Sequence, residues 1–244
     1  MQRLDVVMPE ATGGSMRGLQ SRSNLELDIT TAKQLLSEYN SNYYFVFTDY
    51  AIGKAFDMPF TLDTFKLRVN LVDKLWNAGL HRRANPDRVA ERMFEKSQEL
   101  IRGSSHVRTI NLPNLDLEDS TRRSRLLVAL MEMMEPCPCN ALSFCSKYLH
   151  WAYQDLFVPY DSYVHRSARL LLPHRLSFDV PSSLRSYCHL LSAHQVLWRR
   201  FSDDERQKLV QVDFETQPAA LRRKLFPLRI LDKVLWMAGK PSWR

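Results

Sequence analysis

The sequence predicts an all-α protein: a multi-helix domain that follows a flexible N-terminal leader. The 244 residues are 45% hydrophobic and include only 7 glycines, a composition typical of an ordered globular chain. Apolar residues recur at three- and four-residue spacings along most of the chain, and prolines, glycines and capping residues divide it into segments of helical length. With no internal repeat and no long linker, we expect about eight to ten helices.

The leader comprises residues 1–24, which contain a Gly-Gly pair, scattered Ser and Arg, and no hydrophobic periodicity. Residues 25–244 form the predicted helical domain, either as one body or as two helical subdomains around a cleft. Two threonines precede the first predicted helix, 32–40. The following segment, NYYFVF at 42–47, is predicted as a short strand or a buried helical turn, because periodicity does not separate the two.

The next two predicted helices have clear signals. Within 61–80, one apolar stripe ends near Gly79, a residue type that commonly stops helices; its members are Phe65, Val69, Val72 and Trp76. Within 85–103, Asn85 is a suitable N-cap, Pro86 suits the first helical position and Gly103 ends the pattern.

The rest of the chain continues the helical pattern. Asp119 or Ser120 can cap a helix that ends before Pro136 and Pro138. Its predicted apolar face consists of Leu126, Leu127, Leu130, Met131 and Met134. We then expect a helix from about 140 to 154, a six-residue link, a helix that opens at Asp161 and stops before Pro173, and further helices in 180–201, 203–211 and 218–239.

Charge and targeting signals favour a cytoplasmic protein with a polyanionic partner. The net charge is +7 and the isoelectric point is about 9.3, which favours nucleic acid as that partner. No apolar run approaches the roughly 20 residues needed to cross a bilayer, and the N-terminus lacks the apolar segment of a secretory signal. We therefore expect a cytoplasmic location, nucleoid-associated in a prokaryote, and four reduced cysteines.

Several other chemistries lack their signatures. The cysteines and histidines that could bind a metal do not follow a known ligand spacing, so we expect no metal; they are Cys137, Cys139, Cys145, Cys188, His150 and His165. G-x-S-x-G, P-loop and G-x-G-x-x-G motifs are missing, and no cofactor is expected. The basic clusters HRSARLLLPHR and RRSR are either solvated helix surface or phosphate contacts.

Lys147 and Asp161 form the most informative pair. On a helical wheel, Lys147 lies at the border of a broad aromatic arc, so it is either an ordinary surface lysine or a reactive amine. Asp161 precedes a helical pattern, where a carboxylate serves as an N-cap and is held ionised. The link DLFVPY can extend about 20 Å, whereas the helix after Lys147 advances only about 10 Å, so the chain can return Asp161 to Lys147.

This order of features resembles the helix-hairpin-helix DNA glycosylase/AP-lyase superfamily, in particular its 8-oxoguanine DNA glycosylase branch. The similarity covers about 35 residues and rests on a polar-faced helix with a lysine, a short apolar link ending in Val-Pro-x-Asp, and a helix with basic residues after it. The resemblance implies that Lys147 attacks C1′ of a damaged nucleoside, expels the base and forms a Schiff base. It also implies that Asp161 assists this step.

Other site residues follow from this expectation. Phe144 and Trp151 are predicted to form an apolar wall that stacks a flipped-out base. The usual glycine-rich hairpin is replaced by EPCPCNALSF, so Asn140, Ser143 and Ser146 are the predicted substitutes in phosphate binding. The basic residues after Asp161 that would flank a bound strand are Arg166 and Arg169.

Two functional hypotheses result. The first is a DNA glycosylase, with or without β-lyase activity, that removes an extruded oxidised purine such as 8-oxoguanine. The second is a non-catalytic helical module that binds nucleic acid or protein, for example in a defence system, in which Lys147 contacts phosphate or solvent. Catalysis requires the Lys147 amine within a few ångströms of the Asp161 carboxylate, in a cleft.

Overall fold

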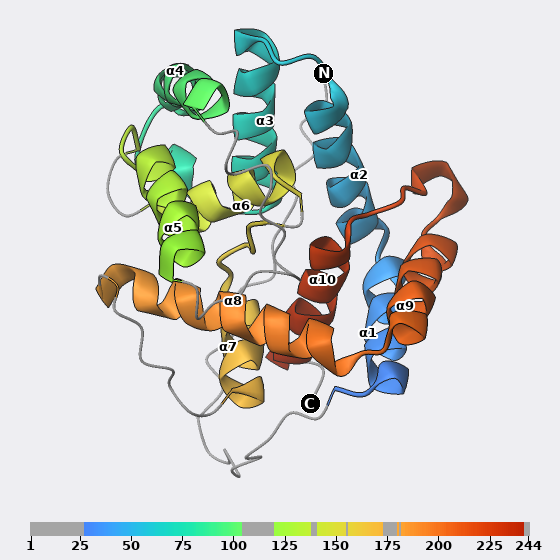
Figure 1. The fold of residues 1–244 in the computed structure, drawn as a ribbon. Helices are drawn as coiled ribbons and strands as arrows, with labels where there is room; N and C mark the ends of the chain where they lie inside the picture. Colours follow the sequence, from blue (N-terminus) through green and yellow to red (C-terminus); the bar gives the residue numbers. More distant parts are fainter. Residues whose placement is uncertain are drawn as a thin grey trace, which may run out of the picture.

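The computed structural model describes residues 27–103, 120–137, 141–154, 156–172, 180 and 182–241. These residues form ten α-helices and no strand, so the all-α prediction is confirmed for them (Figure 1). None of these helices combines the length and the apolar character needed to cross a lipid bilayer. The predicted leader, Cys139 and Asn140 lie outside the described residues. The helices are α1 (Ile29–Ser41), α2 (Tyr43–Asp57), α3 (Leu62–Leu75), α4 (Pro86–Gly103), α5 (Ser120–Met134), α6 (Leu142–Ala152), α7 (Ser162–Leu171), α8 (Ser182–Arg200), α9 (Asp203–Thr216) and α10 (Pro227–Gly239).

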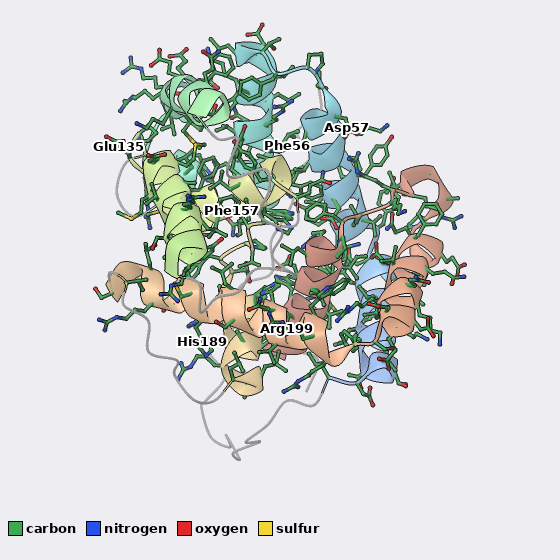
Figure 2. The ribbon with its side chains drawn as sticks, viewed as in Figure 1. Phe56, Asp57, Glu135, Phe157, His189 and Arg199 are labelled. Atoms are coloured by element: carbon green, nitrogen blue, oxygen red, sulfur yellow. The ribbon has the colours of Figure 1, made fainter. Side chains whose placement is uncertain are left out.

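The helices form two groups, which helix α2 connects. In the upper part of Figure 1, α3, α4, α5 and α6 pack together, and in the lower part α10 packs on α1, α7, α8 and α9. Helix α2 contacts α1, α3 and α6, and so connects the groups. One continuous hydrophobic cluster includes residues of both groups, with the fully buried Phe157 near its centre (Figure 2).

The segment around NYYFVF is helical. Helix α1 begins after the N-cap Asp28, whose carboxylate accepts a hydrogen bond from the Thr31 amide. It ends at Ser41, and Asn42 then caps α2 by accepting a hydrogen bond from the Phe45 amide. The segment is therefore helix and not strand. Asn42 explains this outcome, because an N-cap side chain allows a new helix to begin directly after the previous one ends.

Several sequence predictions about helix ends and faces need correction. Helix α10 begins at Pro227, nine residues after the predicted start at 218. Helix α3 ends at Leu75, four residues before the predicted stop at Gly79, and Asn77 adopts a left-handed backbone with φ of 46°. Met131, predicted to lie on the apolar face of α5, is 48% exposed, whereas Met133 is buried. By contrast, α4 spans Pro86 to Gly103 as predicted, and the Asn85 side chain accepts a hydrogen bond from the Asp87 amide.

Helices α7 and α10 approach each other closely at Gly239. A Cβ atom at this position would lie 2.0 Å from the backbone carbonyl oxygen of Tyr163, so only glycine fits without displacement of the backbone. The Ser167 hydroxyl also donates a hydrogen bond to the Leu235 carbonyl across the same contact. These contacts fix the start of α7, and therefore the position of Asp161, against α10.

Candidate active site

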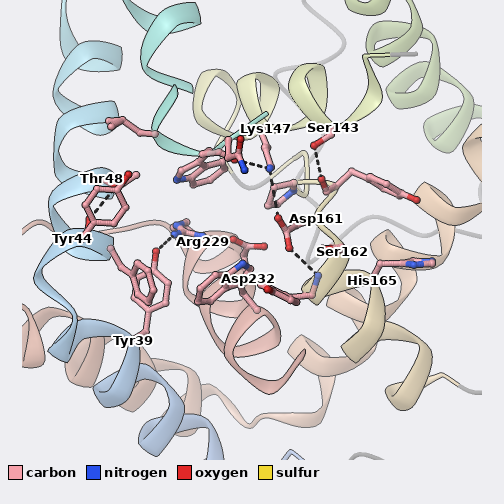
Figure 3. Close-up of a pocket in the computed structure, with 18 residues that line it drawn as sticks. Tyr39, Tyr44, Thr48, Ser143, Lys147, Asp161, Ser162, His165, Arg229 and Asp232 are labelled. Carbon is pink, nitrogen blue, oxygen red and sulfur yellow. Dashed lines mark hydrogen bonds and ion pairs between the residues drawn. The ribbon is translucent and has the colours of Figure 1, made fainter. Parts of the chain in front are cut away.

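A cavity of about 660 Å³ lies between the two groups of helices. Its walls come from α1, α2, the end of α3, α6, the start of α7 and α10. Figure 3 shows Lys147 and Asp161 pointing toward each other in this cavity. Seven of its 18 lining residues are Phe, Tyr or Trp: Tyr39, Tyr44, Phe45, Trp76, Tyr160, Tyr163 and Trp236. The size and the mixture of aromatic and charged groups are typical of a small-molecule site.

Lys147 is a buried residue and not part of a solvated surface. Nine of the 11 residues of α6 are buried, because other helices surround it, and Lys147 is only 5% exposed. Its Nζ donates a hydrogen bond of 2.9 Å to the Trp76 carbonyl oxygen. Burial lowers the pKa of this amine, although the nearby Asp161 carboxylate acts in the opposite direction. The interpretation of Lys147 as an exposed surface lysine is therefore wrong.

Asp161 uses its two carboxylate oxygens for different contacts. Its Oδ1 accepts a hydrogen bond of 2.9 Å from the Tyr163 amide and caps α7, as the sequence predicts. Its Oδ2 lies 3.5 Å from Lys147 Nζ. The cap fixes the side chain so that the second oxygen is presented to the lysine. The residue thus both caps α7 and lies beside Lys147.

Two serines of α6 hold the returning link in place. The Ser146 hydroxyl accepts a hydrogen bond of 2.9 Å from the Tyr160 amide, and the Ser143 hydroxyl donates one of 3.1 Å to the Tyr160 carbonyl. Since Tyr160 precedes Asp161, these bonds position the aspartate. The prediction that Ser146 contacts DNA is wrong, because Ser146 is fully buried. Ser143 lines the cavity, but its hydroxyl proton is already used.

A buried charge cluster forms the wall opposite Lys147. The Arg229 guanidinium lies 2.7 Å from Asp49 and also pairs with Oδ2 of Asp232, while it donates a hydrogen bond to the Tyr39 hydroxyl. Oδ1 of Asp232 has no hydrogen-bond partner among the described residues. Burial raises the pKa of Asp232 to about 7. Burial therefore favours the protonated form of this carboxyl group, which lies at the cavity wall.

The residues of this wall were not predicted from the sequence. Arg229, Asp232 and Lys233 lie in the segment PLRILDKVLW, which is otherwise apolar. Three charged residues within five positions of an otherwise apolar helix predict paired, buried charges, because unpaired charges are costly in a core. This signal can be recognised from the sequence alone. The contributions of Tyr39 and Trp76 to the cavity could not be predicted from the sequence, since they depend on how helices distant in the sequence pack together.

The predicted base pocket is also wrong in its residues. Phe144 and Trp151 are each 1% exposed and do not line the cavity. Phe144 packs near Tyr148, and Trp151 packs near Phe56 and Phe226. Because α6 is enclosed on all sides, its aromatic arc builds the core. The aromatic rings that line the cavity come from α1, α2, α7 and α10, from the C-terminal end of α3 and from the link that precedes α7.

The predicted phosphate contacts on α7 are exposed but lie away from the cavity wall. Arg166 and Arg169 are both exposed, and neither lines the cavity. Arg166 donates a hydrogen bond of 3.4 Å to the Gly239 carbonyl, and Arg169 lies in the last turn of α7, where a cation suits the helix dipole. Both arginines are exposed on α7, and their role in DNA binding stays a prediction.

No metal-binding group is found in the described part of the chain. Within it, no set of three or more His, Cys, Asp or Glu side chains is arranged to hold a metal ion. Cys137, Cys145 and Cys188 are buried thiols, and burial raises the pKa of Cys188 to about 11. His150 donates from Nδ1 to the Phe157 carbonyl at 2.7 Å, and burial lowers its pKa well below the usual value.

Comparisons of the chain with known protein families, with curated proteins and with solved structures found no match. The chemistry of the site therefore rests on its own geometry. That geometry consists of a buried amine with a lowered pKa, a capped carboxylate 3.5 Å from it and a second carboxyl group with one unpaired oxygen, all facing an aromatic cavity.

Proposed function

We propose that the protein is a DNA glycosylase that removes an extruded oxidised purine by nucleophilic attack of Lys147. One observation carries the proposal: the Lys147 amine is buried at the wall of an aromatic cavity, 3.5 Å from the Asp161 carboxylate. A lysine becomes a nucleophile when desolvation lowers its pKa. The catalytic hypothesis requires a lysine amine close to the aspartate carboxylate in a cleft, and the observed distance and cavity are compatible with that requirement.

The first chemical step uses both residues. The neutral Lys147 amine forms a bond to C1′ while the bond from C1′ to the base nitrogen breaks, and the electron pair of that bond leaves with the base. Asp161 stabilises the positive charge that develops on the sugar and accepts the proton that the attacking nitrogen loses. Its Oδ2 is the oxygen that faces the amine, since Oδ1 caps α7.

Proton return completes the reaction. Asp161 gives its proton to the ring oxygen as the sugar opens, and a Schiff base between Lys147 and C1′ results. The expelled purine takes up a proton of its own, for which Asp232 at the cavity wall, with its raised pKa, is a suitable donor. The aromatic rings around the cavity provide surfaces on which a flipped-out base stacks.

The burial of Lys147 argues against a purely binding role for this residue. A lysine that contacts phosphate needs an exposed ammonium group, whereas Lys147 is 5% exposed and donates a hydrogen bond to a backbone carbonyl. A buried amine beside a carboxylate is costly to maintain, and perturbed groups of this kind in cavities are typical of functional sites. The enzyme hypothesis therefore accounts for more of the geometry than the binding module.

Borohydride trapping tests the proposal. The wild-type protein is incubated with DNA that contains 8-oxoguanine or an abasic site, and borohydride reduces any Schiff base to a stable covalent adduct. We expect an adduct with wild type and none with Lys147→Gln. The control Lys208→Gln changes an exposed lysine on α9 and should give the wild-type yield. Circular dichroism checks that both variants fold, and a wild-type protein that forms no adduct with either DNA would contradict the proposal.

A further inference from the structure

The first turns of α2 expose an unusual number of aromatic side chains. Tyr43 is 61% exposed, Tyr44 55% and Phe47 40%. Within the described residues nine large hydrophobic side chains are exposed, and three of them fall within these five positions. Single exposed apolar residues need no explanation, but a cluster of this kind marks an interaction surface. Of the three, only Tyr44 lines the cavity in which the proposed chemistry at Lys147 takes place.

The exposed side chains form an ordered stripe. Tyr43 and Phe47 lie one helical turn apart, and their rings are nearly parallel, with an interplanar angle of 11° and centroids 6.4 Å apart. Tyr50 and Lys54 continue the same face at helical spacing, and the Lys54 ammonium lies 5.6 Å from the centroid of the Tyr50 ring. We call Tyr43, Phe47, Tyr50 and Lys54 the α2 stripe.

The α2 stripe adjoins the cavity. Its neighbours Tyr44, Phe45 and Thr48, from the same two turns of α2, line the cavity wall. Tyr44 is both a lining residue and more than half exposed, so it lies at the rim (Figure 3). A strand that delivers one nucleotide into the cavity past Tyr44 therefore has its neighbouring nucleotides next to the stripe.

The charges around the α2 stripe suit a polyanion. Helix α2 contains two aspartates, and each is paired with an arginine: Asp49 with the buried Arg229, and Asp57 with Arg223 at 2.6 Å. Lys54 is exposed on the stripe itself. On the cavity side, the Lys240 ammonium lies 4.7 Å from the centroid of the Phe45 ring. Open aromatic faces with nearby cations are the combination by which proteins bind single-stranded nucleic acid without sequence preference.

We propose that the α2 stripe is a stacking platform for unpaired bases of a single DNA strand, next to the nucleotide that enters the cavity. This inference rests on the proposed function for its placement of the strand. Tyr43 and Phe47 stack bases, and Lys54 contacts the backbone at the far end of the stripe. The protein then prefers single-stranded or locally unpaired DNA to an intact duplex, because bases within a duplex have no free faces.

Fluorescence anisotropy with undamaged DNA tests the platform separately from catalysis. A labelled oligonucleotide of about 15 nucleotides is titrated as a single strand and as a duplex at one fixed salt concentration, since affinity depends on salt. The double variant Tyr43→Ala/Phe47→Ala should bind the single strand at least about tenfold more weakly, because each base stacked on an aromatic ring contributes about a factor of ten. Its duplex affinity should change much less. The control Phe214→Ala removes another aromatic residue of 40% exposure, on α9, and should bind like wild type.

The outcomes of this experiment and of borohydride trapping are independent. Unchanged single-strand affinity in the double variant overturns the platform, and so does an equal loss for both forms of DNA, even if Lys147 forms an adduct. A selective loss for the single strand supports the platform, even if trapping fails and the proposed chemistry is abandoned. Because the changed side chains are exposed, circular dichroism should show the wild-type helix content in all variants.

Discussion

Asp161 offers a direct way to separate structure from chemistry, because its two oxygens have different partners. Oδ1 caps α7 and Oδ2 faces Lys147 at 3.5 Å. Asparagine caps a helix about as well as aspartate does, whereas alanine does not cap at all. Asp161→Asn therefore removes the negative charge and keeps the cap, while Asp161→Ala removes both. The comparison of these two variants isolates each role.

The expected magnitudes follow from these contacts. Asp161→Ala should be less stable than Asp161→Asn by about 1 kcal/mol, the usual contribution of an N-cap. Both variants should excise the base about 10²- to 10³-fold more slowly than wild type, the usual effect of removing a group that stabilises charge in the transition state. The pKa of Lys147 should fall further in both variants, because the Asp161 carboxylate raises it in the wild type. Schiff-base formation with a ready-made abasic site should therefore persist and extend to lower pH.

Three measurements test these predictions for the two variants. Urea unfolding gives the stability, and single-turnover kinetics with a damaged oligonucleotide give the excision rate. Trapping with an abasic oligonucleotide across a pH series gives the reactivity of the Lys147 amine. Excision by Asp161→Asn at the wild-type rate would refute the role of the charge. Equal stability of the two variants would refute the role of the cap.

Two further predictions concern the support of the site. Gly239→Ala should lower the free energy of unfolding by at least about 1–3 kcal/mol and also slow excision, because its Cβ would lie 2.0 Å from a backbone carbonyl of α7. Gly53→Ala is the matched control for urea unfolding, since its Cβ would meet the guanidinium end of the Arg223 side chain, which can shift more readily than backbone, and the change should cost less. Burial raises the pKa of Asp232 to about 7, above its ordinary value of 3.8, so the folded state holds this proton more tightly than the unfolded state does. Stability should therefore fall by up to about 4 kcal/mol as the pH rises from about 4 to 7, and this fall should be much smaller in Asp232→Asn; parallel pH profiles of the two proteins would contradict the assignment.

Local signals in the sequence predicted most of the helices and the central pair of site residues. Asn85 and Pro86 fixed the start of α4, and the reach of the DLFVPY link allowed Asp161 to return to Lys147. These features depend on nearby residues alone. The end of α3 at Leu75 was less predictable, because Asn77 takes up a left-handed backbone before Gly79 does.

The remaining features of the site depend on tertiary packing. A helical wheel separates an apolar arc from a polar strip, but it assumes that one face of the helix meets solvent. Helix α6 is enclosed on all sides, so Ser146 and Lys147 are buried as deeply as its aromatic residues. For the same reason Phe144 and Trp151 belong to the core, and the cavity takes its rings from helices distant in sequence.

The central claim is that Lys147 is the nucleophile, and the identity of the trapped residue tests it most directly. After borohydride reduction with an abasic or 8-oxoguanine oligonucleotide, the adduct is digested and its site is located by tandem mass spectrometry. We predict a single modified lysine, Lys147, with none of the exposed lysines modified. An adduct on another lysine or on the N-terminal amine, with Lys147 unmodified, would contradict the account.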